Sequence, residues 1–147
     1  NTKETQIALI WNTDGQGIYE GTCGIGFLDH MLQALCVHGK FDIQLSMKGD
    51  LEVDCHHSTE DLGIVLGMAL AKALEEKGGI RRYGTAYIPM DETLGFCSLD
   101  ISGRLFWCMK QNMKPKYWRP GLLYDKRILS CAGLSGRDYA AHENPLW

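Results

Sequence analysis

Two adjacent histidines stand three residues before a glutamate in the stretch "DLEVDCHHSTEDLGI", which runs from Asp50 to Ile64. Such a grouping of imidazole and carboxylate donors suits Mn²⁺, Fe²⁺ or Zn²⁺, and the carboxylates favour the harder ions. A helix start offers a competing explanation for Glu60 and Asp61, because the helix dipole stabilises each acid there by ~0.3–1 kcal/mol. That explanation does not account for His56 and His57. We therefore favour a metal site.

The geometry of the histidine pair depends on the element that carries it. If a strand ends there, His56 and His57 point to opposite faces and either serve two different ions or leave one ring aimed elsewhere. At a helix start, His57 and Glu60 come together because they are three residues apart. His30 and His38 lie eight residues apart on an earlier helical segment, so their directions differ by about 80° and both can line one edge of it.

The elements that must position these residues are predicted from hydrophobic periodicity. Alternation is strictest from Phe41 to Met47, which indicates a strand with one buried face, and helical spacing recurs from Leu62 to Leu74. An α+β layered fold follows, with both helices on one face of a sheet. The predicted elements are strand 5–11 entering a hairpin, a return within 17–27, helix 27–39, two strands within 40–55 with a turn at 48–50, a helix from 58 or 59 to about 77, and strands near 85–92 and 95–108.

Composition narrows the functional classes. The 147 residues suit one domain, and a formal net charge of -3 disfavours a nucleic-acid partner. We expect no membrane partner and a cytoplasmic location, because the sequence shows neither a signal peptide nor an apolar run of spanning length. The cysteines are scattered without a C-x-x-C pair, so we predict reduced core residues rather than bridges or zinc ligands. They are Cys23, Cys36, Cys55, Cys97, Cys108 and Cys131.

Six motifs occur in a characteristic order: "TKET", "GIGFLDHML", "GDLEVDCHHSTEDLGIVLG", "GIRRYG", "PMDETL" and "LDISGR". From residue 2 to about 104 the chain resembles the imidazoleglycerol-phosphate dehydratases of histidine biosynthesis. The resemblance implies βαβ-type half-repeats whose helices pack on one face of a mixed sheet. It also implies loss of water from imidazole glycerol phosphate, giving imidazole acetol phosphate, with a pair of Mn²⁺ ions.

The resemblance assigns roles residue by residue. It makes His30, His56, His57 and Glu60 the metal ligands, with the adjacent histidines serving different ions. Glu4 of "TKET" corresponds to the residue that moves the substrate proton.

Three further positions match the family's substrate site. Arg82 and Arg104 would hold the phosphate of the imidazole substrate bidentately, as guanidinium groups do. His38 falls within the substrate-contacting segment.

The resemblance covers the first of two expected half-repeats and the start of the second. We assign residues 1–109 to the dehydratase-like domain, with the first half-repeat at 1–80 and the start of the second at 81–109. A divergent tail at 110–147 either covers the exposed sheet or is an out-of-frame version of the second half. We expect a homo-oligomer if the second half is complete. The alternative function is a truncated, non-catalytic half that binds metal weakly or co-assembles with a complete enzyme.

Overall fold

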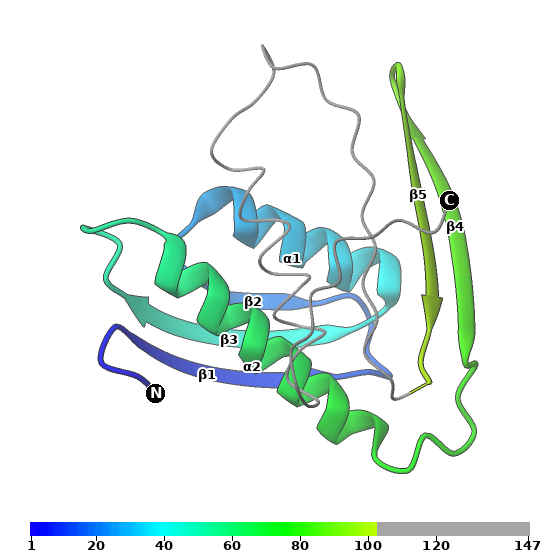
Figure 1. The fold of residues 1–147 in the computed structure, drawn as a ribbon, viewed down its shortest axis with the longest axis horizontal. Helices are drawn as coiled ribbons and strands as arrows, with labels where there is room; N and C mark the ends of the chain where they lie inside the picture. Colours follow the sequence, from blue (N-terminus) through cyan, green and yellow to red (C-terminus); the bar gives the residue numbers. More distant parts are fainter. Residues whose placement is uncertain (103–147) are drawn as a thin grey trace, which may run out of the picture.

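A computed structural model of the chain describes residues 1–102 (Figure 1). The predicted domain boundary after residue 109, the tail at 110–147 and Arg104 lie outside the described residues.

The segment with the strictest alternation forms the middle strand of a three-stranded sheet. This strand, β3 (Asp42–Gly49), pairs antiparallel with β1 (Thr5–Asn12) and parallel with β2 (Tyr19–Thr22), in the order β1-β3-β2. Its inward side chains Ile43 and Leu45 are buried, whereas Gln44 and Ser46 face the other way and are exposed. The mixed sheet is confirmed.

The predicted hairpin between the first two strands is wrong, because β1 and β2 lie on opposite edges of β3. The cause is Asp42, whose Oδ1 accepts hydrogen bonds from the backbone N–H groups of Gln16, Gly17 and Ile18 at 2.8, 3.1 and 2.9 Å. These bonds hold the loop against the start of β3, so that the next strand, β2, pairs with the edge of β3 opposite to β1. They also keep the pKa of Asp42 below its ordinary value.

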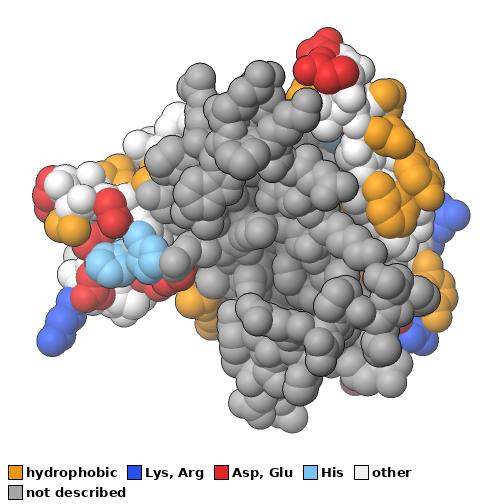
Figure 2. All heavy atoms as spheres, turned by 45° about the horizontal axis from the view of Figure 1, so that its top comes forward, with side chains coloured by type: hydrophobic (Ala, Val, Ile, Leu, Met, Phe, Trp, Pro, Cys, Tyr) orange, Lys and Arg blue, Asp and Glu red, His pale blue; other side chains and the backbone are white. Residues whose placement is uncertain are grey.

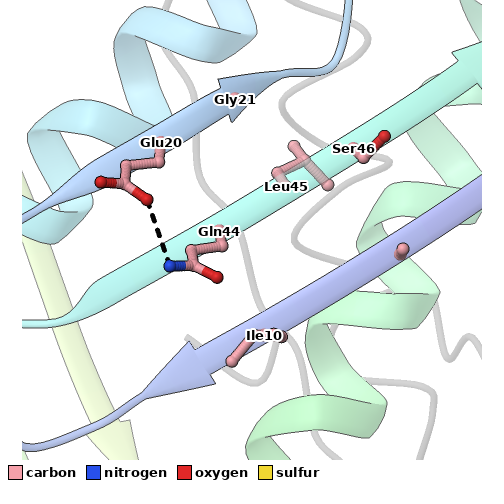
Figure 3. A pocket seen from close by; sticks show the side chains of 7 residues that line it. Ile10, Glu20, Gly21, Gln44, Leu45 and Ser46 are labelled. Atoms are coloured by element: carbon pink, nitrogen blue, oxygen red, sulfur yellow. Dashed lines mark hydrogen bonds between the residues drawn. The ribbon is translucent and has the colours of Figure 1, made fainter.

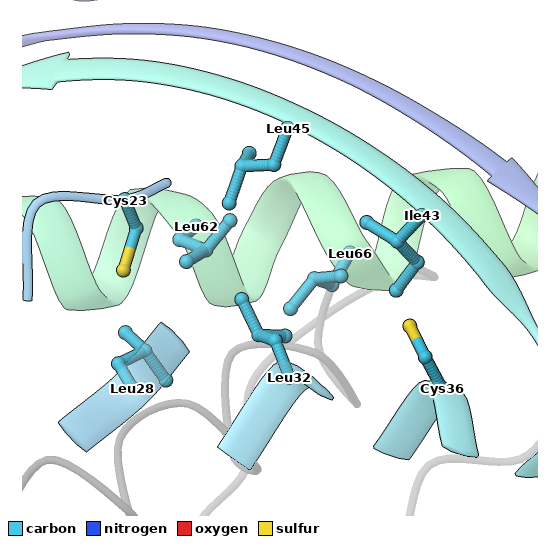
Figure 4. Close-up of a cluster of buried hydrophobic side chains, with 8 residues drawn as sticks. All are labelled: Cys23, Leu28, Leu32, Cys36, Ile43, Leu45, Leu62 and Leu66. Carbon is cyan, nitrogen blue, oxygen red and sulfur yellow. The ribbon is translucent and has the colours of Figure 1, made fainter. Parts of the chain in front are cut away.

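Both helices lie on the same side of this sheet (Figure 1). The first, α1 (Gly26–Gly39), agrees with the predicted helix to within one residue, and it connects β2 to β3 as a βαβ unit. The second, α2 (His56–Leu74), contacts β1 and β3. Together they confirm the α+β fold with helices on one face. The core between helices and sheet contains Cys23, Leu28, Leu32, Cys36, Ile43, Leu45, Leu62 and Leu66 (Figure 4).

The predicted strand over 51–55 is wrong, and its loss moves the start of α2. The backbone N–H of Val53 donates to the carbonyl of Asp50 at 2.8 Å, which closes a turn. Asp54 Oδ1 then accepts the backbone N–H of His56 at 2.7 Å. Such local side-chain bonds compete with strand pairing and favour a helix start. The helix therefore begins at His56, not at Ser58 or Thr59, and ends at Leu74.

A separate hairpin follows, formed by β4 (Tyr83–Met90) and β5 (Thr93–Asp100). The hydroxyls of Thr85 and Ser98 are hydrogen-bonded across it at 3.0 Å, and its side chains are exposed. Figure 2 shows hydrophobic side chains gathered on the side of the molecule where this hairpin lies. Within residues 1–102, neither helix combines the length and the apolar character needed to cross a membrane.

Candidate active site

The first turn of α2 carries the histidine pair as its first two residues. The two rings meet edge to face, with centroids 5.5 Å apart and planes at 79°. His56 Nε2 lies 3.4 Å from Glu60 Oε2, one helical turn further on. Residues four apart lie on the same helix face, so a helix that begins at His56 brings His56 to Glu60. The expected partnership of His57 with Glu60 stays a prediction.

His57 faces a different carboxylate. Its Nδ1 lies 2.8 Å from Oδ2 of Asp50, which follows directly after β3. This hydrogen bond is the largest cause of a raised His57 pKa; nearby charges including that of Glu4 add to it, and burial opposes it. The sequence pattern predicted Asp50 only as a turn residue, so this partner was missed. A carboxylate seven residues before a candidate ligand is a weak signal until the turn between them is known.

The N-terminal segment is fastened to α2 beside the histidines. Thr2 Oγ1 donates to Asp61 Oδ2 at 3.0 Å, and the Thr5 hydroxyl donates to the same oxygen. The expected place of Glu60 and Asp61 in the first turn of the helix is wrong, because a helix that begins at His56 has no acid in that turn. Asp61 instead accepts the two threonine hydroxyls. This attachment carries Glu4, which is exposed and close enough for its charge to raise the His57 pKa. The charge of Glu4 is thus one of those that raise the pKa of His57, and the proton-moving role of Glu4 stays a prediction. Figure 2 shows histidine side chains beside acidic ones at one end of the molecule.

His30 lies on α1, where a polar cluster fixes the start of the helix. Asp29 accepts hydrogen bonds from Tyr19 Oη, Thr22 Oγ1 and the Cys23 backbone N–H at 2.6, 2.6 and 2.8 Å. Burial alone would raise the pKa of Asp29, but these bonds outweigh burial and lower it. His30 itself is exposed, as is His38 in the last turn of α1.

Arg82 is held within the β4–β5 hairpin region. Its Nε and Nη2 donate to the two carboxylate oxygens of Asp100 at 2.7 and 3.2 Å, and its guanidinium lies 4.9 Å from the centre of the Tyr83 ring. The bidentate geometry suits a carboxylate, and it would suit a phosphate equally. The second predicted phosphate ligand, Arg104, lies outside the described residues.

The donors at the start of α2 fit a divalent ion in part. The 3.4 Å between His56 Nε2 and Glu60 Oε2 is about the separation of two ligands that each lie ~2.1 Å from one ion at a tetrahedral angle. Over residues 1–102, however, no group of three or more His, Cys, Asp or Glu side chains is arranged to hold a metal ion. The structure thus brings His56 and Glu60 together, but it does not gather His30, His56, His57 and Glu60 around one point.

A shallow hollow lies on the other face of the sheet, away from the helices (Figure 3). Gln44 Nε2 donates to Glu20 Oε2 there at 3.1 Å. No predicted site residue lines this hollow, so we do not place the candidate site there. The lining residues are Ala8, Ile10, Glu20, Gly21, Gln44, Leu45 and Ser46.

Comparison with known proteins gives one consistent result. Residues 23–120 match the family model described as imidazoleglycerol-phosphate dehydratase. The dehydratase of Heliobacterium modesticaldum is 58% identical over 110 residues, which cover 75% of this chain and 56% of that protein. That of Lachnoclostridium phytofermentans is 60% identical over 103 residues, covering 70% and 53%. The chain thus spans about half the length of the curated relatives it matches.

Solved structures agree with the sequence relatives. The crystal structure of the Staphylococcus aureus dehydratase matches with a TM-score of 0.65 at 31% identity, covering 89% of this chain and 74% of that one. The Pyrococcus furiosus structure, in complex with (S)-C348, matches with a TM-score of 0.69 at 33% identity, covering 92% and 70%. The order of the motifs, the fold and these relatives together show that this chain belongs to the imidazoleglycerol-phosphate dehydratase family.

Proposed function

We propose that this chain carries catalytic machinery for the dehydration of imidazole glycerol phosphate to imidazole acetol phosphate in histidine biosynthesis. The observation that supports this most is the convergence at the first turn of α2. There Thr2 of the N-terminal segment donates to Asp61, and the charge of nearby Glu4 helps to raise the His57 pKa. On the same helix His56 Nε2 lies 3.4 Å from Glu60 Oε2. These groups come from separate parts of the sequence.

The proposed metal ligands are His30, His56, His57 and Glu60, for two Mn²⁺ ions. When bound, Mn²⁺ supplies Lewis acidity toward the imidazole ring of the substrate. The side chains themselves hold and orient: His56 and Glu60 present donor atoms on one helix face, and His57 presents its ring beside them. All three residues belong to α2, and the side chains of His56 and His57 are 33% and 46% exposed.

Glu4 is the proposed general base for the substrate C–H proton. A base of this kind must lie within hydrogen-bonding reach of the proton that it removes. The hydrogen bonds of Thr2 and Thr5 to Asp61 limit how far the segment around Glu4 can swing from α2. Glu4 is exposed, so it can meet a substrate that enters from solvent.

Substrate binding is assigned to Arg82, Arg104 and His38. Arg82 already holds a bidentate carboxylate partner in Asp100, so a phosphate would have to exchange with this partner or share the guanidinium with it. The remaining proposals are a cytoplasmic location, a small-molecule phosphorylated substrate, no nucleic-acid or membrane partner, and a homo-oligomeric assembly.

A second candidate function is a non-catalytic half that binds metal weakly or co-assembles with a complete enzyme. The observation that favours it lies in the described residues 1–102, where no group of three or more His, Cys, Asp or Glu side chains is arranged to hold a metal ion. It predicts Mn²⁺ uptake well below two ions per chain, together with incorporation into an oligomer of a full-length dehydratase.

A Mn²⁺ titration of the full chain, assayed for imidazole acetol phosphate, separates the two candidates. Catalysis predicts product that rises with Mn²⁺ and is lost in His56→Ala. Glu52→Gln is the matched control, because Glu52 is an exposed acid in the preceding turn and no role is assigned to it. No product from folded, metal-loaded protein would refute the catalytic proposal and leave the non-catalytic half.

A further inference from the structure

Asp50 occupies a sheltered position next to an exposed histidine ring. Its side chain is 19% exposed, compared with 46% for His57, and its Oδ2 lies 2.8 Å from His57 Nδ1. Its other oxygen, Oδ1, is buried and has no hydrogen-bond partner in the described part of the chain. Within the described residues, the hydrogen bond to the His57 imidazole is therefore the polar contact that the Asp50 carboxylate makes.

The backbone on both sides of Asp50 is fixed independently of this contact. A Cβ at Gly49 would overlap the hydroxyl of Ser58, so only glycine lets the end of β3 approach α2 this closely. Ser58 is fully buried there. The turn bond from Val53 N–H to the Asp50 carbonyl holds the other side. The Asp50–His57 distance is thus set by the packing of β3 against α2.

This geometry has a consequence for the proton on the ring. A neutral imidazole has one N–H donor and one nitrogen lone pair, and a carboxylate can only accept. A carboxylate 2.8 Å from Nδ1 therefore places the proton on Nδ1 and leaves the lone pair on Nε2. The two ring nitrogens then point in different directions, one toward the protein and one away from Asp50.

We propose that Asp50 is a positioning residue that fixes His57 as the Nδ1–H tautomer and presents Nε2 to a divalent cation. The inference rests on the proposed function only in taking His57 as a metal ligand. Histidine ligands commonly donate their second N–H to a carboxylate, and loss of that partner typically weakens metal binding by about 10–100-fold. Asp50 does not itself contact the ion.

The direct test is ¹⁵N NMR of the full chain labelled at histidine, without metal, at a pH above the pKa of His57. Signals of His57 are identified by their absence in His57→Gln. We expect the Nδ1–H tautomer in the native chain and a change to the Nε2–H tautomer in Asp50→Ala. Glu52→Ala is the control: it removes an exposed acid of the same turn and should leave the tautomer unchanged.

A Mn²⁺ binding titration gives the second readout. Asp50→Ala should weaken binding by about 10–100-fold, and Glu52→Ala by less than about threefold. A native His57 protonated at Nε2, or a tautomer that does not change in folded Asp50→Ala, would overturn the inference. If Asp50→Ala does not fold, the tautomer of the native chain still decides. An Nδ1–H ring in a chain that forms no product would refute the proposed activity and leave the role of Asp50 intact.

Discussion

The carboxylate of Asp29 provides the sharpest test of the forces that set the start of α1. It accepts three hydrogen bonds, from Tyr19 Oη, Thr22 Oγ1 and Cys23 N–H. Replacing it by asparagine keeps its size and one acceptor oxygen. The Thr22 hydroxyl can rotate to accept from the new amide, so the main loss is the charge that strengthens the other two bonds.

The expected magnitude follows from those two bonds. A hydrogen bond to an ionised group contributes about 1.5–3 kcal/mol, and one between neutral groups about 0.5–1.5 kcal/mol. Losing this difference twice destabilises Asp29→Asn by about 2–3 kcal/mol. By the same figures, Tyr19→Phe should cost about 1.5–3 kcal/mol in the native background and about 0.5–1.5 kcal/mol in the Asp29→Asn background. The coupling in the double-mutant cycle should therefore be about 1–1.5 kcal/mol.

The assay is urea unfolding as a function of pH. Because the Asp29 pKa lies below its ordinary value of 3.8 in the folded chain, its contribution is fully present above that value. It is lost as pH falls through the folded pKa, so the gap between native and Asp29→Asn should narrow below about pH 4. Asp14→Asn is the control, since Asp14 is exposed, and should change stability by less than about 0.5 kcal/mol. A gap below about 0.5 kcal/mol at pH 7, or one that persists unchanged in acid, would refute the reasoning.

Three further outcomes test the core and the backbone. Leu62→Ala should destabilise by about 2–5 kcal/mol in urea unfolding because Leu62 is fully buried, whereas Ile64→Ala, at a position 38% exposed, should cost clearly less. Burial raises the pKa of the Cys23 thiol to about 12, so Cys23 should resist iodoacetamide while exposed Cys97 reacts; equal labelling by peptide mass spectrometry would contradict this. Gly21→Ala should destabilise by more than about 1 kcal/mol, since its φ of 103° and the close carbonyl of β3 leave no room for a Cβ; an unchanged unfolding midpoint would exclude that clash.

The predicted elements are most accurate where local periodicity and burial agree. Ile43 and Leu45 alternate with polar residues and do face the core, and the helix predicted over 27–39 is α1. The position of β2 was not predicted because it depends on hydrogen bonds from a loop to the side chain of Asp42, which lies 24–26 residues later in the chain. No periodicity within β1 or β2 records that contact.

The sequence predicted which residues belong to the candidate site better than it predicted which of their side chains contact one another. The charge of Glu4 acts on His57 across more than fifty residues of sequence, and the roles that the family resemblance implied for the two residues stay predictions. The pairing of His56 with Glu60 was missed because Leu51, Val53 and Cys55 alternate as a strand would, which displaced the helix start. Two local hydrogen bonds override that alternation: Val53 N–H donates to the backbone carbonyl of Asp50, and His56 N–H donates to Asp54 Oδ1. Their effect depends on short-range geometry that a hydrophobic pattern does not encode.

The strand order β1-β3-β2 also determines when the sheet can first form during synthesis of the chain. Both outer strands leave the ribosome before the strand that pairs with each of them. Thirty-seven residues separate Asn12 at the end of β1 from Gly49 at the end of β3, which at ~5–20 residues per second is a delay of roughly 2–7 s. Throughout that interval the apolar side chains of Ile7 and Leu9 have no sheet to join. The shortest time to the first complete sheet is thus determined by translation, however strongly β1 favours an extended conformation.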